Sequence, residues 1–265
     1  MNILFIGDVV GKPGREVVKY FIDYLNDQMG VDFVIANLEN ASHGKGLIRS
    51  HFMEMLEAGV DVVTLGNHYL SKKEINEYID AYDQLIRPYN VHSSMKGRGT
   101  GVFEFEGLKI RVTNLLGRVY LADTNNNPFD ALEEIVKTDD SDIHIVDFHA
   151  EATGEKLALA WAFDGKVDAI FGTHTHVQTN DLRTLKNGTV YCSDVGMCGP
   201  YNGILGASKE EVIKRTWTGA PSIFNVQEDD EYVFSAISLV VDEESKKIVE
   251  FNNIYTVIHR SEIYG

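Results

Sequence analysis

Short apolar runs that end in polar, ligand-type residues recur along this chain of 265 residues. In the clearest case, the run 167–171 is followed by Gly172-Thr173-His174-Thr175-His176. The run indicates a buried strand, and open α/β sheets bind ligands beyond the carboxyl ends of their strands. Imidazole is a ligand for zinc, iron, copper and nickel. The pattern therefore favours a sheet that presents two imidazoles at its edge.

The N-terminal part of the chain alternates between strand and helix patterns. Strands are predicted over residues 3–6, 33–36 and 60–65, and helices over residues 14–29 and 49–58. Pro13 opens the first helix and Gly59 closes the second. Such alternation is typical of a parallel sheet with crossover helices.

The remainder of the chain mixes the two patterns. Residues 101–105 and 108–114 predict a hairpin around Glu106-Gly107, and residues 118–128 predict a polar surface loop. Later elements are helices at 129–136, 152–163 and 209–215, the last capped by Ser208, strands at 143–148 and 189–192, a glycine-rich loop at 193–206 and three β-rich runs within 222–257. No repeat or linker is evident, so we expect one domain over residues 1–265 with a mixed α/β core.

Composition narrows the class of partner and the compartment. The net charge of −16 argues against binding of long nucleic acid, although bound cations can reverse the local field for a small phosphate ester. Two cysteines are too few for a disulfide framework and suggest free thiols in a reducing cytoplasm. No apolar run approaches the ~18 residues of a membrane span, and the N-terminus lacks signal-peptide features. We therefore expect a cytoplasmic protein without membrane contact.

Five strand ends carry ligand-type side chains. They are Gly7-Asp8, Glu39-Asn40, Gly66-Asn67-His68, Asp147-Phe148-His149 and the segment with His174 and His176. The carboxyl ends of parallel strands share one edge of a sheet, so these groups should converge. The mixture is too rich for one closed structural zinc site. It fits a two-metal hydrolytic centre in which a carboxylate joins two ions.

These motifs resemble those of the calcineurin-like metallophosphoesterases, which run GD, GD or GE, GNH, a lone His and GHxH. The bacterial YmdB-type branch is more similar still. Its long signatures resemble residues 5–11, 39–46, 147–153 and 194–201, and the likeness extends over nearly the whole chain. The resemblance implies the calcineurin-like metallophosphoesterase fold, a two-sheet β-sandwich core flanked by helices in α/β/β/α layers.

The resemblance also implies roles for individual residues. Asp8 and His176 would bind one metal, Asn67, His149 and His174 the other, and Glu39 would bridge them. The implied cofactors are two divalent ions, iron or manganese ahead of zinc or magnesium. His68 would protonate the leaving oxygen, and a role in orienting a ligand is the alternative.

The sequence departs from the wider family at one ligand position. Most calcineurin-like enzymes carry D-x-H in the first motif, whereas this chain has Asp8-Val9-Val10. Asn40 could substitute through its amide oxygen. His43, Lys45 and Arg49 lie near the second motif and could contact substrate phosphate or form a solvated loop.

The implied function is hydrolysis of small phosphodiesters by a hydroxide activated between two metals, with 2′,3′-cyclic nucleotides as substrates. One alternative is a phosphomonoesterase similar to 5′-nucleotidases. Those enzymes usually carry a separate nucleoside-binding domain, for which we expect this chain to be too short. Another is a regulatory protein that senses a nucleotide and has weak catalysis. The sequence does not determine the oligomeric state, and a homo-oligomer is one alternative.

Overall fold

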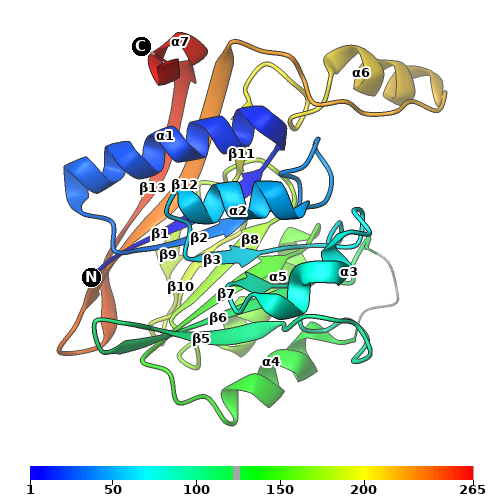
Figure 1. The fold of residues 1–265 in the computed structure, drawn as a ribbon. Helices are drawn as coiled ribbons and strands as arrows, with labels where there is room; N and C mark the ends of the chain where they lie inside the picture. Colours follow the sequence, from blue (N-terminus) through cyan, green and yellow to red (C-terminus); the bar gives the residue numbers. More distant parts are fainter. Residues whose placement is uncertain (122–125, 265) are drawn as a thin grey trace.

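Two β-sheets pack face to face in the computed structural model, which describes residues 1–121 and 126–264, and helices cover both outer faces (Figure 1). The first sheet has the strand order β13-β12-β11-β1-β2-β3-β4. Its strands are β1 (Asn2–Val9), β2 (Phe33–Asn37), β3 (Val62–Thr64), β4 (Leu85–Ile86), β11 (Met197–Pro200), β12 (Glu231–Asp242) and β13 (Lys247–His259). From β11 to β4, neighbouring strands pair in parallel.

The second sheet has the order β5-β6-β7-β8-β10-β9. Its strands are β5 (Thr100–Phe105), β6 (Leu108–Leu116), β7 (Ile143–His149), β8 (Ala169–Thr173), β9 (Arg183–Thr184) and β10 (Val190–Cys192). The central strands β6, β7, β8 and β10 run parallel, and the predicted hairpin forms the antiparallel pair β5–β6.

Side-chain alternation along each strand builds the layers. In β1, Ile3 and Phe5 face the second sheet, whereas Leu4 and Ile6 belong to the core beneath the helices. Phe5 meets Phe171 of β8 with ring centroids 5.1 Å apart, so aromatic packing joins the two sheets. The expected α/β/β/α sandwich is confirmed.

Helices lie on both outer faces. On the first sheet, α1 (Gly11–Met29) and α2 (Arg49–Glu57) bury apolar faces, and α4 (Pro128–Val136) and α5 (Thr153–Ala162) do so on the second. The shorter helices are α3 (Ile75–Tyr78), the 3₁₀ helix η1 (Ile79–Ala81) and α7 (Arg260–Tyr264). By contrast, α6 (Lys209–Thr218) has no buried residue and stands out from the body (Figure 1). Across the described residues, no helix is long and apolar enough to cross a membrane.

Several predicted boundaries change. The loop predicted at 193–206 contains β11, which pairs with β1. In place of the three β-rich runs predicted within 222–257, the structure has the long strands β12 and β13 and a bridge between Ala207 and Val226. Helix α1 begins at Gly11, before Pro13. Ser208 stands at the predicted cap, but its hydroxyl donates to Glu210 instead of accepting from the helix backbone. Residues 122–125 of the predicted loop 118–128 lie outside the described residues.

The five ligand-bearing strand ends belong to both sheets, which corrects the expectation of a single sheet edge. The segments carrying Asp8, Glu39 and Asn67 follow or end strands of the first sheet, and those carrying His149 and His174 belong to the second. Asp8 itself lies within β1, where it pairs with Met197 and Asn37. The candidate site therefore forms where the carboxyl ends of two packed sheets meet.

Candidate active site

One group of ligand-type side chains surrounds His149. The Nε2 atom of His149 lies 3.1 Å from Oε1 of Glu39, 3.0 Å from Oδ1 of Asn67 and 3.0 Å from Nδ1 of His174. Glu39, His149 and His174 each offer a ligand atom, and these three atoms all lie within 4.8 Å of one another. This spacing is suited to a single divalent ion.

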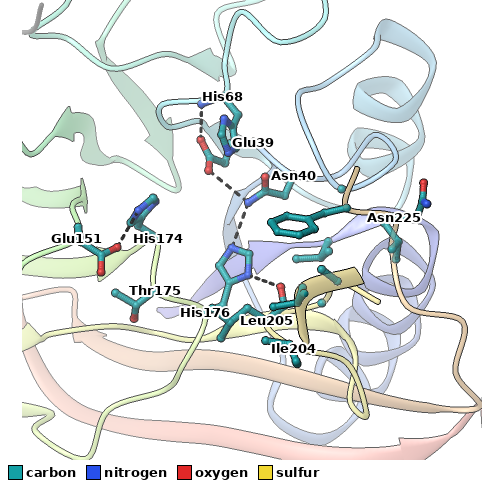
Figure 2. A pocket seen from close by; sticks show the side chains of 17 residues that line it. Glu39, Asn40, His68, Glu151, His174, Thr175, His176, Ile204, Leu205 and Asn225 are labelled. Carbon is teal, nitrogen blue, oxygen red and sulfur yellow. Dashed lines mark hydrogen bonds and ion pairs between the residues drawn. The ribbon is translucent and has the colours of Figure 1, made fainter. Parts of the chain in front are cut away.

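A second group surrounds His176. Its Nε2 atom lies 3.2 Å from the side-chain nitrogen of Asn40 and 3.7 Å from Oδ1 of Asp8. Asn40 in turn donates to Oε1 of Glu39 at 3.2 Å (Figure 2). Because Glu39 also contacts His149, it touches both groups. The structure thus brings together all seven residues predicted as metal ligands. We call them the ligand cluster: Asp8, Glu39, Asn40, Asn67, His149, His174 and His176.

His174 and His176 turn to different groups because of their backbone. Both lie at positive φ, 103° for His174 and 66° for His176, which is uncommon for residues other than glycine and is often found at functional sites. The intervening Thr175 donates its N–H to Asp194 at 3.0 Å, and that carboxylate also accepts from Lys156 at 2.9 Å. A buried ion pair therefore supports the turn between the two histidines.

A buried hydrogen-bond network orients His149 from the other side. Its Nδ1 atom lies 2.8 Å from the hydroxyl of Thr173, which donates to Asp147 at 2.6 Å. Asp147 also accepts from Thr64 and Asn37. With Nδ1 held in this way, Nε2 of His149 faces Glu39 and Asn67.

His68 lies beside the cluster. Its backbone N–H donates to Oε2 of Glu39 at 2.9 Å, and its side chain lines the adjoining cavity (Figure 2). Burial lowers the pKa of His68, and the nearby Glu39 carboxylate opposes that shift. Gly66, which precedes Asn67 and His68, cannot carry a side chain, because a Cβ there would lie 2.5 Å from Nε2 of His149.

Burial and charge perturb the ionisation of the cluster. Burial raises the pKa of Asp8 to about 6, against the influence of His176. Burial also acts to raise the pKa of Glu39, but His149 outweighs it and the pKa falls to about 2. Burial acts to lower the pKa of His149, yet Glu39 and Asp8 raise it to about 9. Burial and His149 together lower the pKa of His174 to about 3. A divalent ion would therefore compete with a proton for His149.

Four members of the cluster, Glu39, Asn40, His174 and His176, line a cavity of about 480 Å³. Its polar side is lined by Glu39, Asn40, His68, Glu151 and the segment 174–176. Val10, at the position where the first motif departs from D-x-H, also lines the cavity and supplies no ligand atom. This volume suits a small organic ligand.

The YmdB-like protein family matches residues 4–254 of this chain. The chain belongs to that family. It is 44% identical over 255 residues to the 2′,3′-cyclic-nucleotide 2′-phosphodiesterase of Bacillus subtilis (strain 168), a match that covers 96% of each chain.

Solved structures agree with the architecture of this YmdB-like protein. The crystal structure of a novel phosphatase from Mycoplasma pneumoniae superposes with a TM-score of 0.93 at 40% identity, covering 100% of this chain and 96% of that one. The NAD nucleotidase of Haemophilus influenzae shares the fold alone, with a TM-score of 0.53 at 14% identity over 98% of this chain and 56% of its own.

The side chains of this YmdB-like chain fit the divalent metals that the fold family implies. Oδ1 of Asp8 is fully buried and has no hydrogen-bond partner among the described residues, although Oδ2 accepts from the N–H of His174 at 2.9 Å. A buried oxygen without a partner is costly unless a ligand from outside the chain satisfies it. The donor set of carboxylate, imidazole and amide oxygen suits iron, manganese or zinc.

Two residues outside the predicted set contact the histidines of this YmdB-like site. Glu151 contacts Nε2 of His174 at 3.0 Å, and the backbone oxygen of Leu205 accepts from Nδ1 of His176 at 2.9 Å. Glu151 lies within residues 147–153, a segment that resembles a family signature, so the sequence could have indicated it. Leu205 contacts His176 through its backbone oxygen, and a backbone contact cannot be predicted from residue type.

Proposed function

We propose that this protein is a metal-dependent phosphodiesterase that hydrolyses small phosphodiesters, with 2′,3′-cyclic nucleotides as the main substrate class. The observation that carries the proposal is the arrangement of two ligand groups that share Glu39 at the floor of one cavity. The name of the 44%-identical relative from Bacillus subtilis supports the substrate class. Residues 1–265 would act as a single metallophosphoesterase domain in the cytoplasm.

The two groups suggest an assignment of ligands. Asp8, Asn40 and His176 would hold one ion, Asn67, His149 and His174 the other, and Glu39 would contact both. The side-chain nitrogen of Asn40 faces Glu39 and His176, so its amide would turn over to present the oxygen to the ion. Iron and manganese are the ions we propose. When bound, such ions supply a hydroxide nucleophile at neutral pH and offset the negative charge of the phosphoryl oxygens.

The chain's own residues orient the reaction. Asn67 directs its Oδ1 toward His149, and its amide nitrogen lies 3.4 Å from Nδ1 of His68. The second N–H of that nitrogen can donate to a phosphoryl oxygen. His68 lines the cavity, and a proton on its ring can pass to the departing oxygen. The buried network below His149 keeps the ligand cluster fixed during turnover.

A substrate panel tests the activity. Purified protein loaded with Mn²⁺ or Fe²⁺ should hydrolyse 2′,3′-cyclic nucleotides and bis-p-nitrophenyl phosphate faster than simple monoesters. A preference for monoesters would favour a nucleotidase-like phosphomonoesterase instead. Nucleotide binding without turnover on any member of the panel would favour a regulatory role.

Glu39→Gln tests the shared ligand. This variant should lose both ions and all metal-dependent hydrolysis, because the neutral amide cannot serve two cations. The circular dichroism spectrum should stay native, and Glu57→Gln, an exposed position in α2, is the matched control. An unchanged metal content would contradict the assignment. Anomalous diffraction at the iron and manganese edges would count and identify the ions.

A further inference from the structure

The cavity above the ligand cluster has an apolar wall that phosphate chemistry does not require. The wall, defined here as Val10, Ile204, Leu205, Val212, Phe224 and Val226, faces the polar side of the same cavity. Leu205 is 51% exposed and Phe224 is 44% exposed. Large apolar side chains that remain exposed at the mouth of a polar site are typical of ligand recognition.

Backbone pairing holds the apolar wall in place. Ala207 and Val226 form an antiparallel bridge, the N–H of Ser208 donates to Asn225 at 2.9 Å, and the N–H of Gln227 donates to Gly206 at 2.9 Å. Val226 also packs closely on two glycines. A Cβ added to Gly11 or to Gly44 would lie 2.9 Å from its Cγ2 atom. The wall is thus anchored to the start of α1 and to the loop that follows Glu39 and Asn40.

The ring of Phe224 is held from one side. The guanidinium of Arg215 in α6 lies 5.1 Å from the ring centroid, and Asn225 is bound by Glu211 of the same helix at 2.7 Å. Arg215 therefore covers part of the ring, and the remaining surface of Phe224 lines the cavity. The protruding helix α6 thereby has a local role, which is to support an aromatic surface beside the site.

The apolar wall is also joined directly to the ligand cluster. Leu205 lies at φ 53°, which is strained for a leucine, and its carbonyl accepts from Nδ1 of His176 at 2.9 Å (Figure 2). A phosphate held near His176 therefore lies next to the wall. The group attached to that phosphate must pack against Leu205 and Phe224 or extend into solvent.

We propose that the apolar wall is a nucleobase platform on which Phe224 stacks the base of a cyclic nucleotide, an inference that rests on the proposed phosphodiesterase function. Bases are flat and largely uncharged at neutral pH, and they stack on aromatic side chains with little dependence on sequence. The wall offers one aromatic ring, several aliphatic groups and no acidic side chain. The cavity volume of about 480 Å³ suits one mononucleotide rather than a polymer or a lipid tail.

Phe224→Ala tests the platform with two substrates that differ only in the base. For 2′,3′-cyclic AMP, kcat/KM should fall roughly 5- to 140-fold, mainly through KM, because stacking on the ring is lost. For the 2,3-cyclic phosphate of ribose lacking a base, kcat/KM should change less than about twofold. Phe224→Tyr should restore the wild-type ratio. Trp217→Ala, an 85% exposed aromatic of α6 that does not line the cavity, is the matched control and should change neither value.

Two outcomes would overturn the platform: an equal loss on both substrates, or no loss on the cyclic nucleotide. Calorimetric binding of adenosine 3′-monophosphate to the metal-loaded protein separates this proposal from the proposed function. If no diester is hydrolysed but the nucleotide binds and Phe224→Ala weakens that binding roughly 5- to 140-fold, the platform stands and the phosphodiesterase function falls. If hydrolysis proceeds and the nucleotide binds the wild-type protein and Phe224→Ala equally, the platform is contradicted and the phosphodiesterase function is not.

Discussion

His174 and His176 are separated by a single residue, yet they contact different groups of ligand-type side chains. His174 approaches His149 and Glu151, whereas His176 approaches Asp8 and Asn40. In a regular strand, side chains two residues apart point to the same face. The positive φ values of both histidines break that rule. At the scale of single residues, the unusual backbone is what allows so short a motif to reach two groups of ligand-type side chains.

His68 is the residue whose loss should separate proton transfer from metal binding. His68→Ala should keep the metal content and slow hydrolysis of a diester with an alkoxide leaving group by on the order of 10²–10⁴-fold. A p-nitrophenolate leaving group needs little protonation, so bis-p-nitrophenyl phosphate should be affected far less. Comparing kcat for the two substrates is the measurement. An equal loss on both would assign His68 to orienting a ligand instead.

Glu151 should tune the metal affinity through His174. Its carboxylate contacts Nε2 of His174 at 3.0 Å, while Nδ1 of that ring faces His149. Carboxylates that hold the outer nitrogen of a metal-binding imidazole typically change affinity 10- to 100-fold. We expect Glu151→Gln to weaken metal binding by about that factor in a chelator competition assay. An unchanged affinity would mean that the contact is incidental.

The elements around the site were predictable to different degrees. Strands β1, β2, β7 and β8 contain clear apolar runs, so their polar ends indicated candidate ligands, and the family resemblance implied the role of each. By contrast, β11 has only four residues, including Gly199 and Pro200, and forms through pairing with the distant β1. Its strand character arises from tertiary contacts that local propensity does not encode. Leu205 was not predicted for a related reason, since its backbone carbonyl and not its side chain binds His176.

The connection between β10 and β11 carries a buried ion pair that should be costly to break. Lys156 of α5 and Asp194 are both almost fully buried and lie 2.9 Å apart. Lys156→Met leaves the carboxylate without its partner, so we expect a loss of about 3–5 kcal/mol in the free energy of unfolding. Urea denaturation of this variant and of Lys156→Met/Asp194→Asn is the test. The double variant should be less destabilised than the sum of the single ones, because the unpaired charge is gone, and strict additivity would contradict this account.

At the scale of the whole molecule, the ligand cluster joins two sheets that are also held by apolar packing and by the hydrogen bonds of Asn37 and Thr64 to Asp147. Asp8, Glu39 and Asn67 come from the first sheet and its loops, and His149 and His174 come from the second. The sequence indicated that these strand ends would meet, but apolar runs alone do not show how strands divide between sheets. That division depends on long-range pairing, and it turns an edge site into a site between layers.

Because the ligands come from both sheets, metal binding should stabilise the fold as a whole. An ion that binds only the folded chain, at 100 times its dissociation constant, adds about 2.7 kcal/mol to the free energy of unfolding. For a chain of this size, that should raise the melting temperature by roughly 5–10 °C per ion. Calorimetry of chelator-treated and Mn²⁺-loaded protein measures the shift. Glu39→Gln should show none of it, because it loses the carboxylate that contacts both groups. If the loaded protein binds manganese and still melts at the temperature of the chelated protein, the unfolded chain binds the ion as tightly as the folded one, and the two sheets do not create the site.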